Sequence, residues 1–176
     1  MHDHSQMNHG DETHVHPEST PIEYLKFVGV ILAIFGIAYF INSNFGTETV
    51  SSYLRMFMGT FFLVFGTFKL LDLKGFAMSY IGYDVIAKRF MSYAYAYPFI
   101  ELALAFGYFF QVPYTDWVTL VFMAVGSIGV LQELLRGSKI KCACLGTYIR
   151  LPLTTVSLIE NVAMGIMALF MIIKII

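Results

Sequence analysis

Charged residues are scarce in this chain. Asp, Glu, Lys and Arg make up 13% of the 176 residues, against about 25% in ordinary soluble domains. Hydrophobic residues make up 57%, and so few polar groups cannot cover that apolar content in water. The composition therefore excludes an ordinary soluble domain and predicts a membrane protein. The net charge of −1 gives no basic field for a nucleic-acid partner, and the length leaves no room for a second large domain.

Basic residues are also missing ahead of the first apolar run. Residues 1–21 are polar and acidic and contain no Lys or Arg. A cleavable signal peptide needs a basic segment and a small-residue cleavage site. We therefore expect the first apolar run to remain in the mature protein.

Long apolar runs dominate the rest of the chain. A bilayer core of about 30 Å requires roughly 20 helical residues, and backbone groups in lipid must satisfy their own hydrogen bonds. The sequence therefore predicts an all-α membrane protein, a bundle of five transmembrane helices. The five runs are Tyr24–Ile41, Tyr53–Leu71, Tyr93–Phe110, Trp117–Leu135 and Val156–Ile173.

Two of these runs carry glycines seven residues apart, Gly29 with Gly36 and Gly59 with Gly66. Seven residues are about two helical turns, so each pair lies on one face. Small residues on one face allow helices to approach closely. We expect both faces to pack against neighbouring helices.

The cations lie mainly in two connections, residues 72–92 and 136–155. With five spans, both connections share one side of the membrane with the N-terminal tail. The positive-inside rule assigns that side to the cytoplasm. We therefore expect an integral protein of the bacterial inner membrane whose tail and second basic connection are cytoplasmic.

Only two cysteines occur, and they stand one residue apart. Cys142 and Cys144 lie in KCACLGTYIRLP, close to Lys139, Lys141 and Arg150. A disulfide at this spacing is strained and suited to exchange, and the cations favour the reactive thiolate. The same sulfurs suit a soft ion such as Cu(I), while inert loop cysteines are the third interpretation. Because the cytoplasm keeps thiols reduced, that side favours metal binding or a transient catalytic disulfide.

All five histidines lie within the first 16 residues. Imidazole and thioether groups bind copper, and imidazole also binds zinc or nickel. A short His-rich tract is a compositional sign of metal binding, and without metal such a tail is disordered. The candidate metal ligands are His2, His4, His9, Met7, His14 and His16, together with Cys142 and Cys144.

Two carboxyl groups lie inside predicted spans. Glu101 and Glu160 are each about 12 Å deep from the cysteine side, at 1.5 Å per helical residue, and Lys69 ends the second span on that side. Ionisable residues at such depths face a bundle interior or a watery cavity. A polar pocket there can relay protons, hold a quinone headgroup or pass an ion. Alternatively, the carboxyl groups are protonated or paired with Lys69 and lock the helices together. The opposite half of the membrane region is expected to be almost purely apolar.

Two stretches resemble a known family. FKLLDLKGFAMSYIGYDVIAKRFMSYAYAYPFIELALA resembles the DoxX-like membrane proteins, and KCACLGTYIRLPLTTVSLIENVAMGIMALFMI adds a closer resemblance to their MauE branch. The resemblance runs from Arg55 to the C-terminus, and its most specific parts are the Cys-x-Cys-Leu-Gly stretch, the run Tyr97–Leu102, and Lys69 with Asp72.

This resemblance implies a redox-associated membrane core of four helices. MauE proteins are linked to the maturation of methylamine dehydrogenase, a disulfide-rich periplasmic enzyme, through thiol–disulfide handling; the resemblance does not assign a methylamine role to this chain. The expected division is a His/Met-rich tail (1–21), an extra helix and loop (22–52) and a four-helix MauE/DoxX-like domain (53–176).

Three functions follow from these features. In the first, Cys142 and Cys144 exchange thiols with a thioredoxin-like partner, and Glu101 or Glu160 carries the proton. In the second, the tail and the cysteines bind or transport copper or another heavy metal together with a metal-carrying protein. In the third, the chain is a non-catalytic membrane scaffold.

Overall fold

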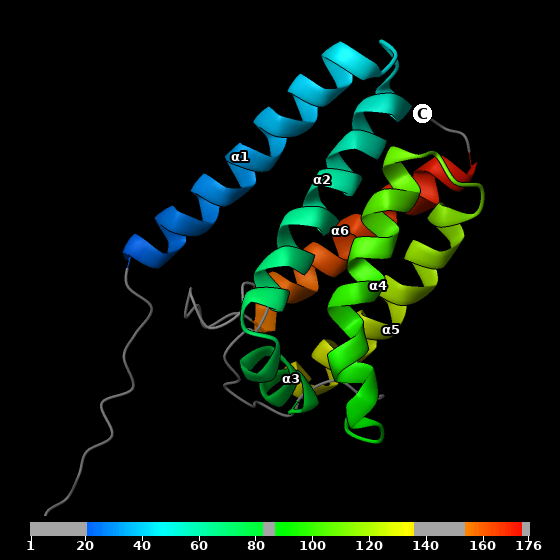
Figure 1. The fold of residues 1–176 in the computed structure, drawn as a ribbon. Coiled ribbons are helices and arrows are strands. Elements are labelled where there is room, and N and C mark those ends of the chain that lie inside the picture. The colour runs from blue at the N-terminus through cyan, green and yellow to red at the C-terminus, as the bar shows by residue number, and fades with distance from the viewer. Residues whose placement is uncertain (1–20, 83–86, 136–153, 174–176) are drawn as a thin grey trace, which may run out of the picture.

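The computed structural model describes residues 21–82, 87–135 and 154–173 (Figure 1), which form α-helices and no strand. The prediction of an all-α membrane bundle is confirmed, because α1, α2 and α5 are long and apolar enough to cross a membrane and α6 contains a shorter apolar stretch, Leu158–Ile173. The five long helices fall on the five predicted apolar runs. The helices are α1 (Pro21–Phe45), α2 (Val50–Leu71), α3 (Leu73–Ile81), α4 (Met91–Phe109), α5 (Thr115–Leu135) and α6 (Thr154–Ile173).

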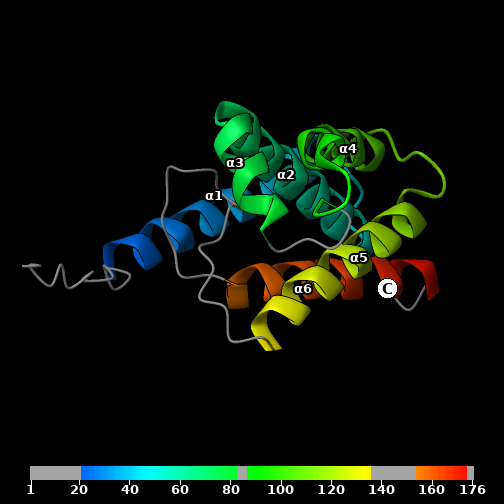
Figure 2. The same cartoon turned by 90° about the horizontal axis from the view of Figure 1, so that it is seen from below.

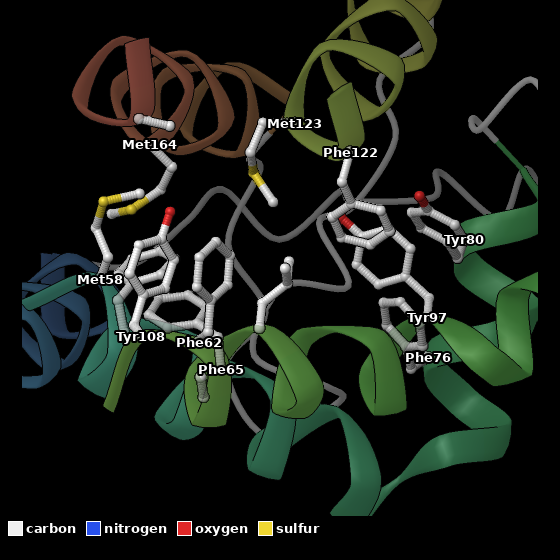
Figure 3. Packing of buried hydrophobic residues seen from close by; sticks show 14 of the residues in the cluster. Met58, Phe62, Phe65, Phe76, Tyr80, Tyr97, Tyr108, Phe122, Met123 and Met164 are labelled. Atoms are coloured by element: carbon white, nitrogen blue, oxygen red, sulfur yellow. The ribbon is translucent and has the colours of Figure 1, made fainter. Parts of the chain in front are cut away.

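The long helices form two layers, which Figure 2 shows from below. In one layer α2 packs along α4, and in the other α5 packs along α6. The helix α1 lies against α2, and α3 packs against α4. Buried aromatic and methionine side chains fill the space between the layers, as Figure 3 shows for Phe62, Phe65, Tyr97, Phe122 and Met123. Any site enclosed by the bundle therefore lies between these two layers.

Successive long helices run in opposite directions (Figure 1). We call the end where α2 and α5 finish and α4 and α6 begin the α3 end, because the short helix α3 lies there. The opposite end holds the α1–α2 and α4–α5 turns. The connection between Leu135 and Thr154, which contains both cysteines in the sequence, leaves and rejoins the helices at the α3 end.

The turn between α1 and α2 is fixed by one buried and two partly buried hydrogen bonds. Asn42 is 2% exposed, and its side-chain oxygen accepts a 2.6 Å hydrogen bond from Ser52 Oγ. The Asn42 amide donates to the Thr47 carbonyl at 3.2 Å. Thr49 caps α2 by accepting a hydrogen bond from the Ser52 backbone N–H, which satisfies one of the donors left free at a helix start. These contacts orient α1 against α2.

The helix α3 was not expected from the sequence. Its nine residues are too few to cross a membrane, but Phe76, Ala77 and Tyr80 recur at helical spacing and are buried. Asp72 closes α2 and caps α3, accepting a 2.9 Å hydrogen bond from the Gly75 backbone N–H. The sequence LDLKG therefore ends α2, starts α3 and brings α3 against α4.

The two glycine pairs differ in their surroundings. Gly59 and Gly66 are buried and face α4, where a Cβ atom would lie within 3.3 Å of Phe109 or Leu102. Close packing is confirmed for this pair. Gly29 and Gly36 are exposed, with no atom near a Cβ position. The expectation for α1 is therefore not met within the described part of the chain.

Candidate functional site

A small cavity, which we call the central cavity, lies between the two helix layers, near the α3 end. Its volume is about 30 Å³, which is enough for one or two water molecules. Its aromatic wall includes Phe65, Phe76, Tyr80 and Tyr97, three of which gather on one side of the core in Figure 3. Its polar lining consists of Lys69 from α2, Glu101 from α4, and Glu160 with Asn161 from α6.

Lys69 is the cation of this cavity. It stands in the last turn of α2 and is 6% exposed. Its ammonium group donates a hydrogen bond to Glu101 Oε1, forming a buried ion pair between α2 and α4. The ammonium also lies 4.9 Å from the centre of the Tyr97 ring and 5.5 Å from that of Phe76. Aromatic faces attract a cation, so the rings compensate for part of the hydration that Lys69 loses on burial.

Two carboxylate oxygens beside the cavity lack a hydrogen-bond partner within the described residues. They are Glu101 Oε2 and Glu160 Oε1, each fully shielded from solvent. Buried polar atoms are almost always satisfied by protein or ordered water, so such atoms call for an explanation. The cavity supplies one, because bound water can bridge the two oxygens.

The structure thus brings together Glu101 and Glu160, the two carboxyl groups singled out in the sequence. It pairs Lys69 with Glu101, as one of the two sequence interpretations proposed. Asp72, which was named with Lys69 in the family resemblance, does not line this cavity and instead caps α3. The predicted ligands Cys142 and Cys144 lie outside the described residues, as do His2, His4, Met7, His9, His14 and His16.

Among residues 21–82, 87–135 and 154–173, no three His, Cys, Asp or Glu side chains gather as a metal site. A metal site on the described helices is therefore not indicated. The copper hypothesis concerns the tail and the cysteines, on which the described helices have no bearing.

The opposite end contains polar groups that sequence reasoning missed. Tyr108 is 2% exposed, and its hydroxyl donates a 3.0 Å hydrogen bond to Thr119, which is fully buried. Asp116 and Arg55 line a cavity of about 240 Å³ beside them. The expectation that this half is almost purely apolar is wrong. A signal was present in the sequence, because Asp116 and Thr119 are three residues apart and so share one helix face.

Removing the Tyr108 hydroxyl is expected to cost about 1–3 kcal/mol, the range for leaving a buried hydrogen-bond partner unsatisfied. The variant Tyr108→Phe should unfold at a lower denaturant concentration in detergent. Thr119→Val alone should have a similar effect, and the double variant should add little because both groups are then gone. Tyr114→Phe, at an exposed hydroxyl of the same end, is the control. A Tyr108→Phe protein as stable as this control would contradict the assignment.

Comparison with known proteins gives one family. The family model of methylamine utilisation protein MauE matches residues 47–174. The matched region contains α2 to α6 and the residues of the central cavity, whereas α1 lies outside it. No curated protein and no solved structure gives a significant match.

Proposed function

Because the chain belongs to the MauE family of membrane proteins, we propose that it takes part in the maturation of a partner protein by thiol–disulfide exchange at Cys142 and Cys144. One observation carries this proposal. The buried cluster of Lys69, Glu101 and Glu160 lies toward the end of the bundle at which the cysteine-containing connection begins and finishes. Proton-holding groups and two neighbouring thiols at one end suit exchange chemistry, in which thiols lose and regain protons.

The proposed exchange involves two partners, the maturing protein and a thioredoxin-like protein. A thiolate of the maturing protein attacks the Cys142–Cys144 disulfide, forming a mixed disulfide and releasing one cysteine as a thiolate. A second thiolate of that protein resolves the mixed disulfide, which leaves the maturing protein oxidised and Cys142 and Cys144 reduced. The disulfide of a thioredoxin-like partner then restores the pair by the reverse steps and is itself reduced. The protons that the maturing protein's thiols lose end on the released Cys142 and Cys144 thiolates, with Glu101 or Glu160 as the nearest proton carrier.

The test is the thiol state of the partner proteins in cells carrying Cys142→Ser, Cys144→Ser or both substitutions. One single variant should accumulate a mixed disulfide with the thioredoxin-like partner, because the cysteine that resolves this disulfide is missing, and the double variant should form none. The variant Tyr114→Phe, an exposed position at the opposite end, controls for expression. Unchanged partner thiols in all three cysteine variants would refute the exchange.

The proposed orientation places the tail and the cysteines on the cytoplasmic side of a bacterial inner membrane. A membrane-impermeant maleimide should then label the cysteines only after cells are permeabilised, and mild reduction should increase the labelling because the exchange starts from a Cys142–Cys144 disulfide. Labelling of intact cells after mild reduction would instead indicate a disulfide outside the cytoplasm. That result would overturn the proposed orientation and leave the exchange itself standing.

Binding or transport of copper or another soft metal is the second candidate function, supported by five histidines within 16 residues. In this proposal the tail (1–21) binds the ion, the helix and loop (22–52) link the tail to the four-helix domain (53–176), and a metal-carrying protein supplies it. Metal content should fall when the histidines are replaced by Gln and when Cys142 and Cys144 are replaced by Ser. Equal metal content in wild type and both variants would exclude this candidate.

A further inference from the structure

The central cavity contains an imbalance of ionisable groups. Lys69 on α2, Glu101 on α4 and Glu160 on α6 all line it. The residues that α5 contributes, Met123, Gly126 and Val130, carry no charge, and α3 contributes only Phe76 and Tyr80. In the described part of the chain, one cation and two carboxyl groups therefore line a cavity of about 30 Å³.

An excess negative charge is unfavourable in a cavity enclosed by membrane helices. Burying one uncompensated ion carries a large free-energy penalty, and within a membrane span ionisable groups are paired or neutralised. If both carboxyl groups were ionised, the cavity would carry one unbalanced negative charge. One additional positive charge removes the imbalance, and a proton is the smallest candidate that fits the available volume.

The contacts indicate which carboxyl group takes the proton. Glu101 is 3% exposed and already accepts a hydrogen bond from the Lys69 ammonium. Glu160 forms no ion pair within the described residues, and its buried Oε1 has no hydrogen-bond partner there. A protonated Glu160 therefore leaves one intact ion pair and one neutral acid.

The second unpartnered oxygen, Glu101 Oε2, makes the proton exchangeable. Glu101 belongs to the α2–α4 layer and Glu160 to the α5–α6 layer, and both line the same water-sized space. A bridging water can pass the proton between them, while the Lys69 ammonium pairs with whichever carboxylate is left charged.

We infer that this cavity is a proton-binding site in which Glu160 holds one exchangeable proton while Lys69 and Glu101 keep opposite charges. The site rests on the cavity alone and not on thiol exchange at the cysteines. It makes a counting prediction: the number of protonated carboxyl groups equals the number of carboxyl groups minus the number of lysines.

Infrared spectroscopy of the full chain at neutral pH, in a detergent without ester groups, tests this count. The C=O stretch of a protonated carboxyl group shifts on exchange into D2O. Each variant is compared with wild type, so that carboxyl groups elsewhere cancel. Glu160→Gln should lose one such band. Glu101→Gln should also lose it, because Lys69 then pairs with an ionised Glu160. The double variant Lys69→Met/Glu101→Gln should retain the band, since Glu160 is again without a counter-charge.

Glu48→Gln, at an exposed position in the α1–α2 turn, is the control and should leave the spectrum unchanged. A band that survives in Glu160→Gln would overturn the assignment. A band that survives in Glu101→Gln would overturn the shared charge balance, because Glu160 would then be neutral regardless of Lys69. A wild-type band that appears only after sodium is removed would indicate a metal cation in place of the proton. If Glu101→Gln fails to fold, Glu160→Gln still decides the assignment, and Lys69→Met decides the charge balance, because the count predicts a second protonated carboxyl group in that variant.

Discussion

Replacing Lys69 by Met is expected to destabilise the bundle by about 3–5 kcal/mol, the range measured when one partner of a buried ion pair is removed. The side chain is 6% exposed and its ammonium pairs with Glu101, which is 3% exposed. Met fills a similar volume, so the loss arises mainly from Glu101, which loses its counter-charge and must take up a proton to become neutral. The cost also includes the contacts of the ammonium with the Tyr97 and Phe76 rings.

The measurement is unfolding in mixed detergent micelles, followed by circular dichroism. Lys26→Met on α1, where the lysine is exposed, should change stability little. Adding Glu101→Gln to Lys69→Met should recover much of the loss, because the uncompensated carboxyl group is then removed. A Lys69→Met protein as stable as the Lys26→Met control would show that the ion pair contributes nothing.

Glu101→Gln alone should cost less than Lys69→Met. The Lys69 ammonium keeps a second carboxyl group, Glu160, on the same cavity. Glu101 has no second ammonium among the residues that line the cavity. This asymmetry distinguishes a cluster of three groups from an isolated pair, for which the two substitutions would cost about the same.

The helices of this bundle could largely be predicted from the sequence, because the length of an apolar run fixes whether a helix can cross lipid. The expected run Tyr53–Leu71 and the observed α2, Val50–Leu71, differ only at the start, where Thr49 caps the helix. Capping extends a helix into polar residues that a hydropathy argument leaves out. The same argument could not find α3, whose nine residues pack against α4 and are too few to cross the membrane.

For the central cavity, the depth of its carboxyl groups could be predicted from the sequence, but their partners could not. Helical rise placed Glu101 and Glu160 at similar depth, but depth does not determine which helices are neighbours. Lys69 pairs with Glu101 because α2 packs along α4, and that pairing is a property of the packed bundle. The hydrogen bond between Tyr108 and Thr119 was missed for a related reason, since the spacing of Asp116 and Thr119 does not determine that Tyr108 of α4 lies within reach of Thr119.

Replacing Gly66 by Leu is expected to destabilise the bundle by about 3 kcal/mol, the upper end of the usual range for overpacking. A Cβ atom at this position would lie 3.2 Å from Leu102 Cδ2 and 3.3 Å from the Pro98 carbonyl oxygen. The first neighbour can move, but the second is backbone and cannot move without shifting α4. Helix association in lipid depends on close packing rather than on removal of apolar surface from water, so separating α2 from α4 loses what holds the two helices together.

Gly36→Leu is the matched control, because it makes the same change within a membrane helix. No atom lies within 4 Å of a Cβ position at Gly36. Both substitutions raise intrinsic helix propensity equally, so this contribution cancels between the two variants and the difference measures packing alone. Gly66→Leu should also disturb the central cavity, since Lys69 stands less than one turn further along α2 and its partner Glu101 lies on α4. Equal unfolding midpoints for the two variants would contradict the close approach of α2 and α4, and with it the geometry on which the Lys69–Glu101 pair depends.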